Sequence, residues 1–185
     1  VNLFGESMIA SYTVATRMEN ILMIPIIGIQ NTMATFAGQN MGARQPERVS
    51  KGLGQGVLVS LLMTAALCLC QLLGMELIIR AFKLDAAAAA ICRQHLFASV
   101  LSEPIFAIYF PANGMFQGVG EGFHATFYAL MALGLRVVFA YSLYRTAFFG
   151  YTAIWWSQAM AWTLTLITCY AHFFRGKWKD KSLIS

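Results

Sequence analysis

The chain has 185 residues, of which 58% are hydrophobic and only 11% are charged. Soluble domains carry about 25% charged residues, so this composition excludes an ordinary soluble protein and indicates a membrane protein. The formal net charge is +5. Because much of the basic charge lies in predicted loops and in the tail, it is typical of membrane topology rather than of nucleic-acid binding. The cysteines show no paired CxxC spacing, so neither a zinc site nor a disulfide framework is predicted.

The first apolar stretch, Met8 to Ala43, is predicted to be the central helix of a membrane bundle. Its second half, residues 21–38, carries no charge over about the minimum length that crosses a bilayer core. At helical spacing one face is mostly polar, and it comprises Thr13, Arg17, Asn20, Ile24, Gly28, Asn31, Thr35 and Gln39. Polar groups are costly against lipid, so this face is expected to look into a bundle or a water-filled cavity. Glu19 points to roughly the opposite side.

Four further helices are predicted, which makes the chain an all-α, polytopic transmembrane bundle of about five spanning helices. The expected bounds of the spans are 8–40, 52–79, 91–118, 122–144 and 148–174. The third span contains Pro104 and Pro111, whose freed backbone carbonyls need neighbouring helices or water. Residues 1–7 are expected to be the stub of a preceding helix and an external loop. Residues 175–185 are expected to form a basic cytoplasmic tail that is disordered at its end.

The distribution of basic residues predicts which ends face the cytoplasm. With five spans, the first loop and the C-terminal tail share a side and hold seven Lys or Arg residues: Arg44, Arg48, Lys51, Arg175, Lys177, Lys179 and Lys181. The opposite side holds four: Arg80, Lys83, Arg93 and Arg145. Cytoplasmic loops are the richer in Lys and Arg, so the tail is predicted to be cytoplasmic.

Two glycine-bearing motifs carry a family resemblance. The first comprises Ala10, Thr16-Arg17-Met18-Glu19, Pro25, Gly28 and the run Gly38-Gln39-Asn40-Met41-Gly42-Ala43. The second comprises Gly114 and Gly118-Val119-Gly120-Glu121-Gly122. In order and spacing, both resemble motifs of multidrug and toxic compound extrusion (MATE) transporters, and the similarity runs over nearly the whole chain. The chain departs at Glu121-Gly122, where the family often has an Asp-Thr pair.

The MATE resemblance implies an architecture and a set of partners. In that family the first motif occurs once per six-helix lobe, on the second helix and the loop after it. The five helices would therefore be helices eight to twelve of twelve, in the C-terminal lobe. The implied partners are membrane lipid, a small organic cation, H⁺ or Na⁺ and the N-terminal lobe of the same transporter, without nucleic acid. The implied location is the cell (inner) membrane.

Four charged side chains within the predicted spans form the candidate site: Arg17, Glu19, Glu103 and Arg136. We expect them to form an intramembrane network with no net charge. In one interpretation, Glu103 or Glu19 is the protonatable or Na⁺-coordinating carboxylate of an antiporter, because burial disfavours its charge and a nearby arginine favours it. In the other, both glutamates are permanently paired with the arginines and only fix helix packing, since unpaired burial is costly.

Other side chains are weaker candidates. Asn31 and Asn113, with Gln30, Gln39 and Asn40, could coordinate an ion or substrate or could bridge helices by hydrogen bonds. Phe106 and Tyr109, with Phe110 and Phe116, could attract organic cations or could simply pack against lipid. The histidines, His95, His124 and His172, show no mutual metal spacing and are predicted to be interfacial. No metal site is predicted, and a Na⁺ site is left unassigned.

The predicted function is a secondary active antiporter that exports organic cations or drugs in exchange for H⁺ or Na⁺. One alternative is a lipid-linked oligosaccharide flippase of the same superfamily, which would need a strongly cationic cavity to hold pyrophosphate. The other is a non-transporting membrane scaffold, in which every buried polar group is statically paired. The sequence contains no phosphate-binding loop, nucleophile elbow or dinucleotide fingerprint, so neither an enzyme nor a cofactor is predicted.

Overall fold

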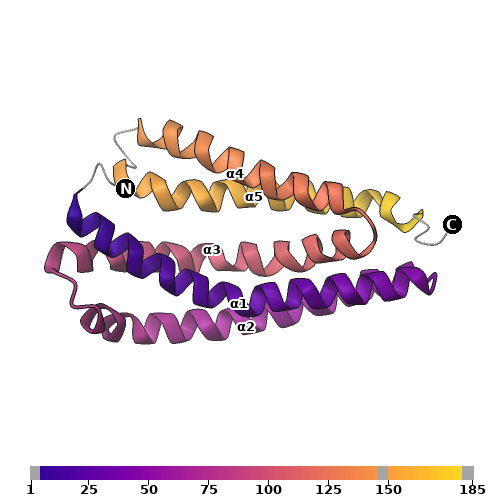
Figure 1. The fold of residues 1–185 in the computed structure, drawn as a ribbon, viewed down its shortest axis with the longest axis horizontal. Helices are drawn as coiled ribbons and strands as arrows, with labels where there is room; N and C mark the ends of the chain where they lie inside the picture. The colour runs from indigo at the N-terminus through magenta and orange to yellow at the C-terminus, as the bar shows by residue number, and fades with distance from the viewer. Residues whose placement is uncertain (1–4, 146–149, 181–185) are drawn as a thin grey trace.

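The described residues form five long α-helices that pack side by side (Figure 1). The structure is a computed structural model, and it describes residues 5–145 and 150–180. The helices are α1 (Glu6–Gly42), α2 (Pro46–Ala81), α3 (Ala86–Gly118), α4 (Gly122–Tyr144) and α5 (Ala153–Arg175), with 3₁₀ turns η2 (Gly150–Thr152) and η3 (Lys177–Asp180). The fold is therefore all-α, as predicted. Of the predicted stub, residues 1–4 lie outside the described residues and Glu6 already belongs to α1.

The surface of the bundle is that of a membrane protein. By length and composition α1, α2, α3 and α4 can each cross a membrane. Large apolar side chains are exposed along the outer faces of α2 and α4, among them Leu62, Leu73, Leu77, Leu130 and Val138. Helix α5 is not among these four candidates, but its 23 residues span about 34 Å and it packs along α4. It is therefore long enough to be the fifth span of the bundle.

Helix α3, and not α1, lies at the centre of the described bundle. It contacts each of the other four long helices, and in Figure 1 it runs between the α1–α2 pair and the α4–α5 pair. It is also far more buried than α1, α2 or α4. The prediction that Met8 to Ala43 forms the central helix is thus wrong for this part of the protein. The reason is that the polar face of α1 is left exposed, so that only its opposite face is packed.

Helix α1 and helix α3 approach closely where the two glycine motifs meet. A Cβ atom added at Gly114 would collide with the backbone carbonyl of Gln30, and one at Gly118 would collide with that of Ala34. Gly38 in turn lies against the carbonyl oxygen of Gly118. Small residues allow helix backbones to approach closely in lipid, where packing rather than the hydrophobic effect drives association.

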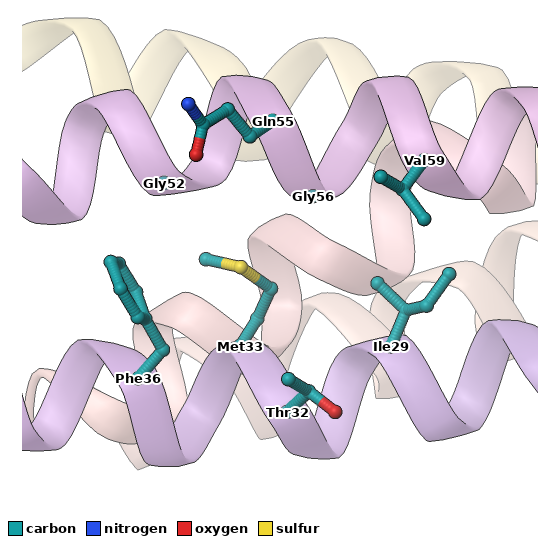
Figure 2. A pocket seen from close by; sticks show the side chains of 8 residues that line it. All are labelled: Ile29, Thr32, Met33, Phe36, Gly52, Gln55, Gly56 and Val59. Atoms are coloured by element: carbon teal, nitrogen blue, oxygen red, sulfur yellow. The ribbon is translucent and has the colours of Figure 1, made fainter.

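Helices α1 and α2 meet in a different way, through large side chains of α1 that pack on glycines of α2. Figure 2 shows Phe36 and Met33 projecting from α1 toward Gly52 and Gly56. A Cβ atom at either glycine would meet these side chains rather than backbone. Between the helices lies a mostly apolar pocket of about 260 Å³, whose polar lining side chains are Thr32 and Gln55.

Polar contacts tie the ends of the helices together. Asp85 caps α3 by accepting a hydrogen bond from the Ala88 amide at 2.7 Å, and its second oxygen accepts one from the Ser7 hydroxyl at 3.1 Å. These two donors, the Ala88 amide first, lower the pKa of Asp85 from its ordinary value. At the same end of the bundle, the guanidinium of Arg93 pairs with both carboxylate oxygens of Glu76, at 2.6 and 2.9 Å.

The first part of the basic tail is folded onto the bundle. Trp178 is fully buried, stacks on Phe173 and donates a hydrogen bond from Nε1 to the Phe173 carbonyl at 3.1 Å. Lys179 pairs with Glu47 at the start of α2, with 2.9 Å between Nζ and Oε1. The predicted disordered end of the tail lies outside the described residues, because residues 181–185 are not among them.

The close approach of α1 and α3 predicts that Gly114→Ala destabilises the protein. The added methyl group must displace backbone, and overpacking of this kind typically costs about 1–3 kcal/mol. Thermal unfolding of the purified protein in detergent should therefore show a lower midpoint for this variant.

Gly134→Ala in α4 is the matched control, because a Cβ atom there has no neighbour within 4 Å. Alanine is a better helix former than glycine by about 1 kcal/mol, so this variant should be neutral or slightly more stable. Equal midpoints for the two variants would contradict the packing described here.

Candidate functional site

A cavity of about 230 Å³ lies between α1, α3, α4 and α5. Three of the four charged residues predicted from the sequence line it, namely Glu19, Glu103 and Arg136. The other lining residues are Tyr12, Thr16, Asn20, Met23, Phe106, Phe110, Gln158 and Trp162. The cavity thus combines ionisable groups with an aromatic wall, at a level of the bundle where α3 carries Pro104.

Glu103 is the most deeply buried of the charged side chains at this cavity. Its exposed fraction is 1%, and its Oε2 atom has no hydrogen-bond partner within the described residues. A buried carboxylate without partners is costly, so this oxygen is available to a proton, an ion or water that enters the cavity. The predicted permanent pairing of Glu103 with an arginine is not found among the described ion pairs.

Glu19 has a histidine partner that sequence reasoning missed. Its Oε1 lies 3.0 Å from Nε2 of His95 on α3. The imidazole is 3% exposed and lies between the rings of Tyr12 and Trp155, at centroid distances of 5.4 and 4.8 Å. The prediction that His95 is interfacial is therefore wrong. Its position on the buried face of α3 could have been recognised only if α3 had been known to be central.

Arg136 and Arg17 occupy different surroundings. Arg136 is half-buried on α4 and reaches the cavity, and no described ion pair joins it to an acidic residue. Arg17 is exposed on the opposite face of α1 from Glu19, and it does not line the cavity. All eight residues of the predicted polar face of α1 are exposed, including Asn31. The four predicted charges are therefore split between a cavity and an open polar face.

Asn113 belongs to a hydrogen-bond network and does not line the cavity. Its Nδ2 donates to the Tyr109 hydroxyl and to the Ala125 carbonyl, each at 2.9 Å. Its Oδ1 accepts from the amides of Gln30 and Gln117, at 2.9 and 2.8 Å. Because these bonds join α1, α3 and α4, the structural interpretation of Asn113 as a helix-bridging amide fits its contacts.

The aromatic set on α3 is divided between cavity and core. Phe106 and Phe110 line the cavity together with Trp162 of α5, whose ring centre lies 5.3 Å from that of Phe106. Tyr109 and Phe116 are buried in the main apolar core instead. The cavity wall of three aromatic rings is a surface on which an organic cation can lie.

The predicted motif residues build the α1–α3 crossing and the two turns at its end. Gly38 and Gly118 lie at the crossing, and Asn40 is buried with its Nδ2 donating to the Phe36 carbonyl at 2.8 Å. Gly42 ends α1, and Ala43 follows as its C-cap. Gly120 has a φ of 81°, which suits glycine, in the turn between α3 and α4. Gln39 is exposed on the polar face of α1.

Comparison with known proteins defines the family. The MatE family model matches residues 1–142, and the chain therefore belongs to the MatE family. It is a multi-pass membrane transporter domain and not an enzyme, as predicted. A stretch of 48 residues is 34% identical to a FAD transporter of Shewanella oneidensis, covering 26% of this chain and 11% of that protein.

Two solved structures share the fold. A MOP superfamily transporter from Pyrococcus furiosus, for which reverse polarity of the binding pocket suggests a different function, aligns with a TM-score of 0.86 at 15% identity. That alignment covers 98% of this chain and 40% of the other. A multidrug resistance MATE family transporter in an outward-facing conformation aligns with a TM-score of 0.78 at 20% identity, over 96% and 40% of the two chains. The chain thus spans 40% of the length of these transporters.

The contact between Glu19 and His95 predicts an energetic coupling between them. His95→Phe keeps an aromatic ring between Tyr12 and Trp155 but removes the hydrogen bond, and Glu19→Leu removes the hydrogen-bonding group of the other partner. Leaving a buried polar group without its partner costs about 1–3 kcal/mol, so each single variant should unfold at a lower temperature.

A double-mutant cycle measures the coupling directly. The double variant should be destabilised less than the sum of the single variants, with an interaction energy of about 0.5–3 kcal/mol, by thermal unfolding of the full-length transporter. Additive effects of the two substitutions would show that the contact contributes nothing.

Proposed function

We propose that the chain forms part of a secondary antiporter that exports organic cations or drugs in exchange for H⁺ or Na⁺, with Glu103 as the exchanging carboxylate. The observation that supports this most strongly is the Glu103 side chain itself, buried at a cavity with one oxygen unpartnered among the described residues. A carboxylate so placed can hold a proton or a Na⁺ ion in one state and a cationic substrate in the other.

The charge of the cavity favours a cation over a phosphorylated substrate. Two carboxylates, Glu19 and Glu103, line it against one guanidinium, that of Arg136. A flippase for lipid-linked oligosaccharides would need an excess of cations to hold pyrophosphate. The wall formed by Phe106, Phe110 and Trp162 adds faces that attract organic cations.

The unpartnered oxygen of Glu103 also argues against a static scaffold. A scaffold needs every buried polar group to be paired, because an unpaired one only reduces stability. The network around Asn113 meets that requirement, with four hydrogen bonds to its side chain. Glu103 is not fully paired in this way, so its burial is better explained by a ligand that binds reversibly.

The exposed polar face of α1 suggests where the other part of the transporter lies. Arg17, Asn20, Asn31 and Gln39 are exposed along a helix that is long and apolar enough to cross a membrane, where lipid would be an unfavourable neighbour for them. We expect this face to look onto an aqueous passage shared with the N-terminal lobe, as transporters built from repeated lobes hold their substrates between them. Rocking of the lobes would use Pro25, Pro104 and Pro111 as bending points. The basic tail would lie on the cytoplasmic side of the cell membrane.

Glu103→Gln is predicted to abolish coupled transport while leaving the fold intact. Glutamine keeps the shape of the side chain but neither releases a proton nor carries the charge that attracts a cation. In proteoliposomes of the full-length transporter, ethidium transport driven by an imposed pH or Na⁺ gradient should fall at least tenfold. Glu76→Gln is the matched control, because Glu76 is exposed, pairs with Arg93 and lies away from the cavity, so transport should stay at the parental rate.

Three outcomes of the transport assay would contradict the proposal. Parental transport by the Glu103→Gln variant would remove Glu103 from the exchange. No gradient-dependent transport by the folded parent protein would favour the scaffold. Gradient-driven movement of a flavin nucleotide but not of ethidium would favour an anionic substrate, in line with the short stretch that is similar to the FAD transporter.

A further inference from the structure

A cluster of metal-binding side chains lies at the end of the bundle where α3 passes into α4. Glu121, His124 and His172 each offer a ligand atom, and these atoms lie within 4.8 Å of one another. None of the three lines the cavity at Glu103. We propose that they form a binding site for a transition-metal dication, for which Zn²⁺ is the best fit.

The turn between α3 and α4 positions the carboxylate. The Glu121 amide donates to the Phe116 carbonyl at 2.8 Å, and the preceding Gly120 takes a positive φ that lets the chain reverse. Glu121 is thereby held at 4% exposure directly before α4 begins. His124 follows one helical turn later on the same face of α4.

The second imidazole comes from the last turn of α5. His172 stacks on Phe116 with ring centres 4.9 Å apart, so α3 fixes its position as well. The rings of His124 and His172 lie 4.5 Å apart at an angle of 58°. Helices α3, α4 and α5 therefore all contribute to holding the three ligands, of which His172 lies 48 residues after His124.

Two of the three separations between ligand atoms suit a single tetrahedral ion, and all three are within 4.8 Å. Oε2 of Glu121 lies 3.1 Å from Nε2 of His172 and 3.6 Å from Nδ1 of His124. Atoms that share a tetrahedral Zn²⁺ at about 2.0–2.1 Å lie about 3.4 Å apart. Two histidines and one carboxylate are a ligand set that leaves the fourth position to water. The adjoining cavity of about 590 Å³ has room for that water.

The hydroxyl group of Tyr128 completes the arrangement. It lies 2.6 Å from Nδ1 of His172, on the side of the ring opposite to the ligand nitrogen. When Nδ1–H donates to this oxygen, Nε2 carries a lone pair that points to Glu121. Metal-binding histidines usually have such a partner on the second nitrogen, which fixes the tautomer and the ring orientation.

The charges around the cluster select among metals. Arg175 and Lys177 line the same cavity, so a cation held by charge alone is disfavoured there. Mg²⁺ and Ca²⁺ also require mostly oxygen ligands, of which the three side chains offer few. Metals that bond strongly to imidazole are favoured instead, and among these Zn²⁺ accepts the four-coordinate geometry most readily.

Zinc binding to the full-length transporter tests the proposal. The protein is purified without a polyhistidine tag, and its Zn²⁺ affinity is measured by competition with a chromophoric chelator. We expect His124→Ala and His172→Ala each to weaken one Zn²⁺ site at least tenfold. Tyr128→Phe should weaken the same site about tenfold, because loss of an outer partner typically costs 10–100-fold in affinity. His95→Phe is the control and should leave the site unchanged, since His95 contacts Glu19 instead.

Two further readouts separate a specific site from loss of fold. Zn²⁺ should raise the thermal midpoint of the parent but not of the His124→Ala variant, and Mg²⁺ should raise neither. Co²⁺ in place of Zn²⁺ should give the visible absorption of a tetrahedral centre, which disappears with His124→Ala. His124 is only half-buried, so this variant should fold. An unchanged Zn²⁺ affinity in a folded His124→Ala variant would overturn the proposal.

Discussion

Polar groups at the depth of the bilayer must find partners inside the protein, and the packing of α3 follows from this constraint. Asn113 bonds to neighbours on three helices, and Gln71 of α2 donates to Ser99 and to the Leu96 carbonyl of α3. These contacts require the helices to lie close together, which small residues such as Gly114 permit. Several buried side-chain atoms have no hydrogen-bond partner among the described residues, including the hydroxyls of Ser60 and Thr64 and one carboxylate oxygen of Glu103. An ionised carboxylate costs more to bury than a hydroxyl, so Glu103 is the group for which a proton or a cation as partner is expected.

Much of the architecture could be predicted because membrane helices leave strong signals in a sequence. Length and lack of charge predicted the five helices, and glycine motifs predicted the family. Pairing between helices was harder, because periodicity shows which residues share a face and not which helix covers it. The sequence therefore predicts a network that joins Arg17 to Glu103 and an interfacial His95, whereas His95 contacts Glu19 in the structure.

The same limit explains why the cluster of Glu121, His124 and His172 has no sequence signature. Metal-site motifs are recognised when the ligands are close in the chain, as on one helix or in one loop. Here α4 runs away from the cluster and α5 returns to it, so its last histidine lies 48 residues after His124 and meets it only in three dimensions. Trp178 was missed for a related reason: a single aromatic residue in a basic run gives no period, yet it is fully buried.

The fold-back of the tail has a mechanical consequence. Lys179 of η3 bonds to Glu47, 132 positions earlier. The first turn of α2 is thereby joined to the segment that follows α5. At the opposite end of the bundle, the hydrogen bond from Ser7 to Asp85 joins the start of α1 to the start of α3. Both contacts lie at the surface, where such pairs add little stability, so they align the two ends of the bundle without locking them.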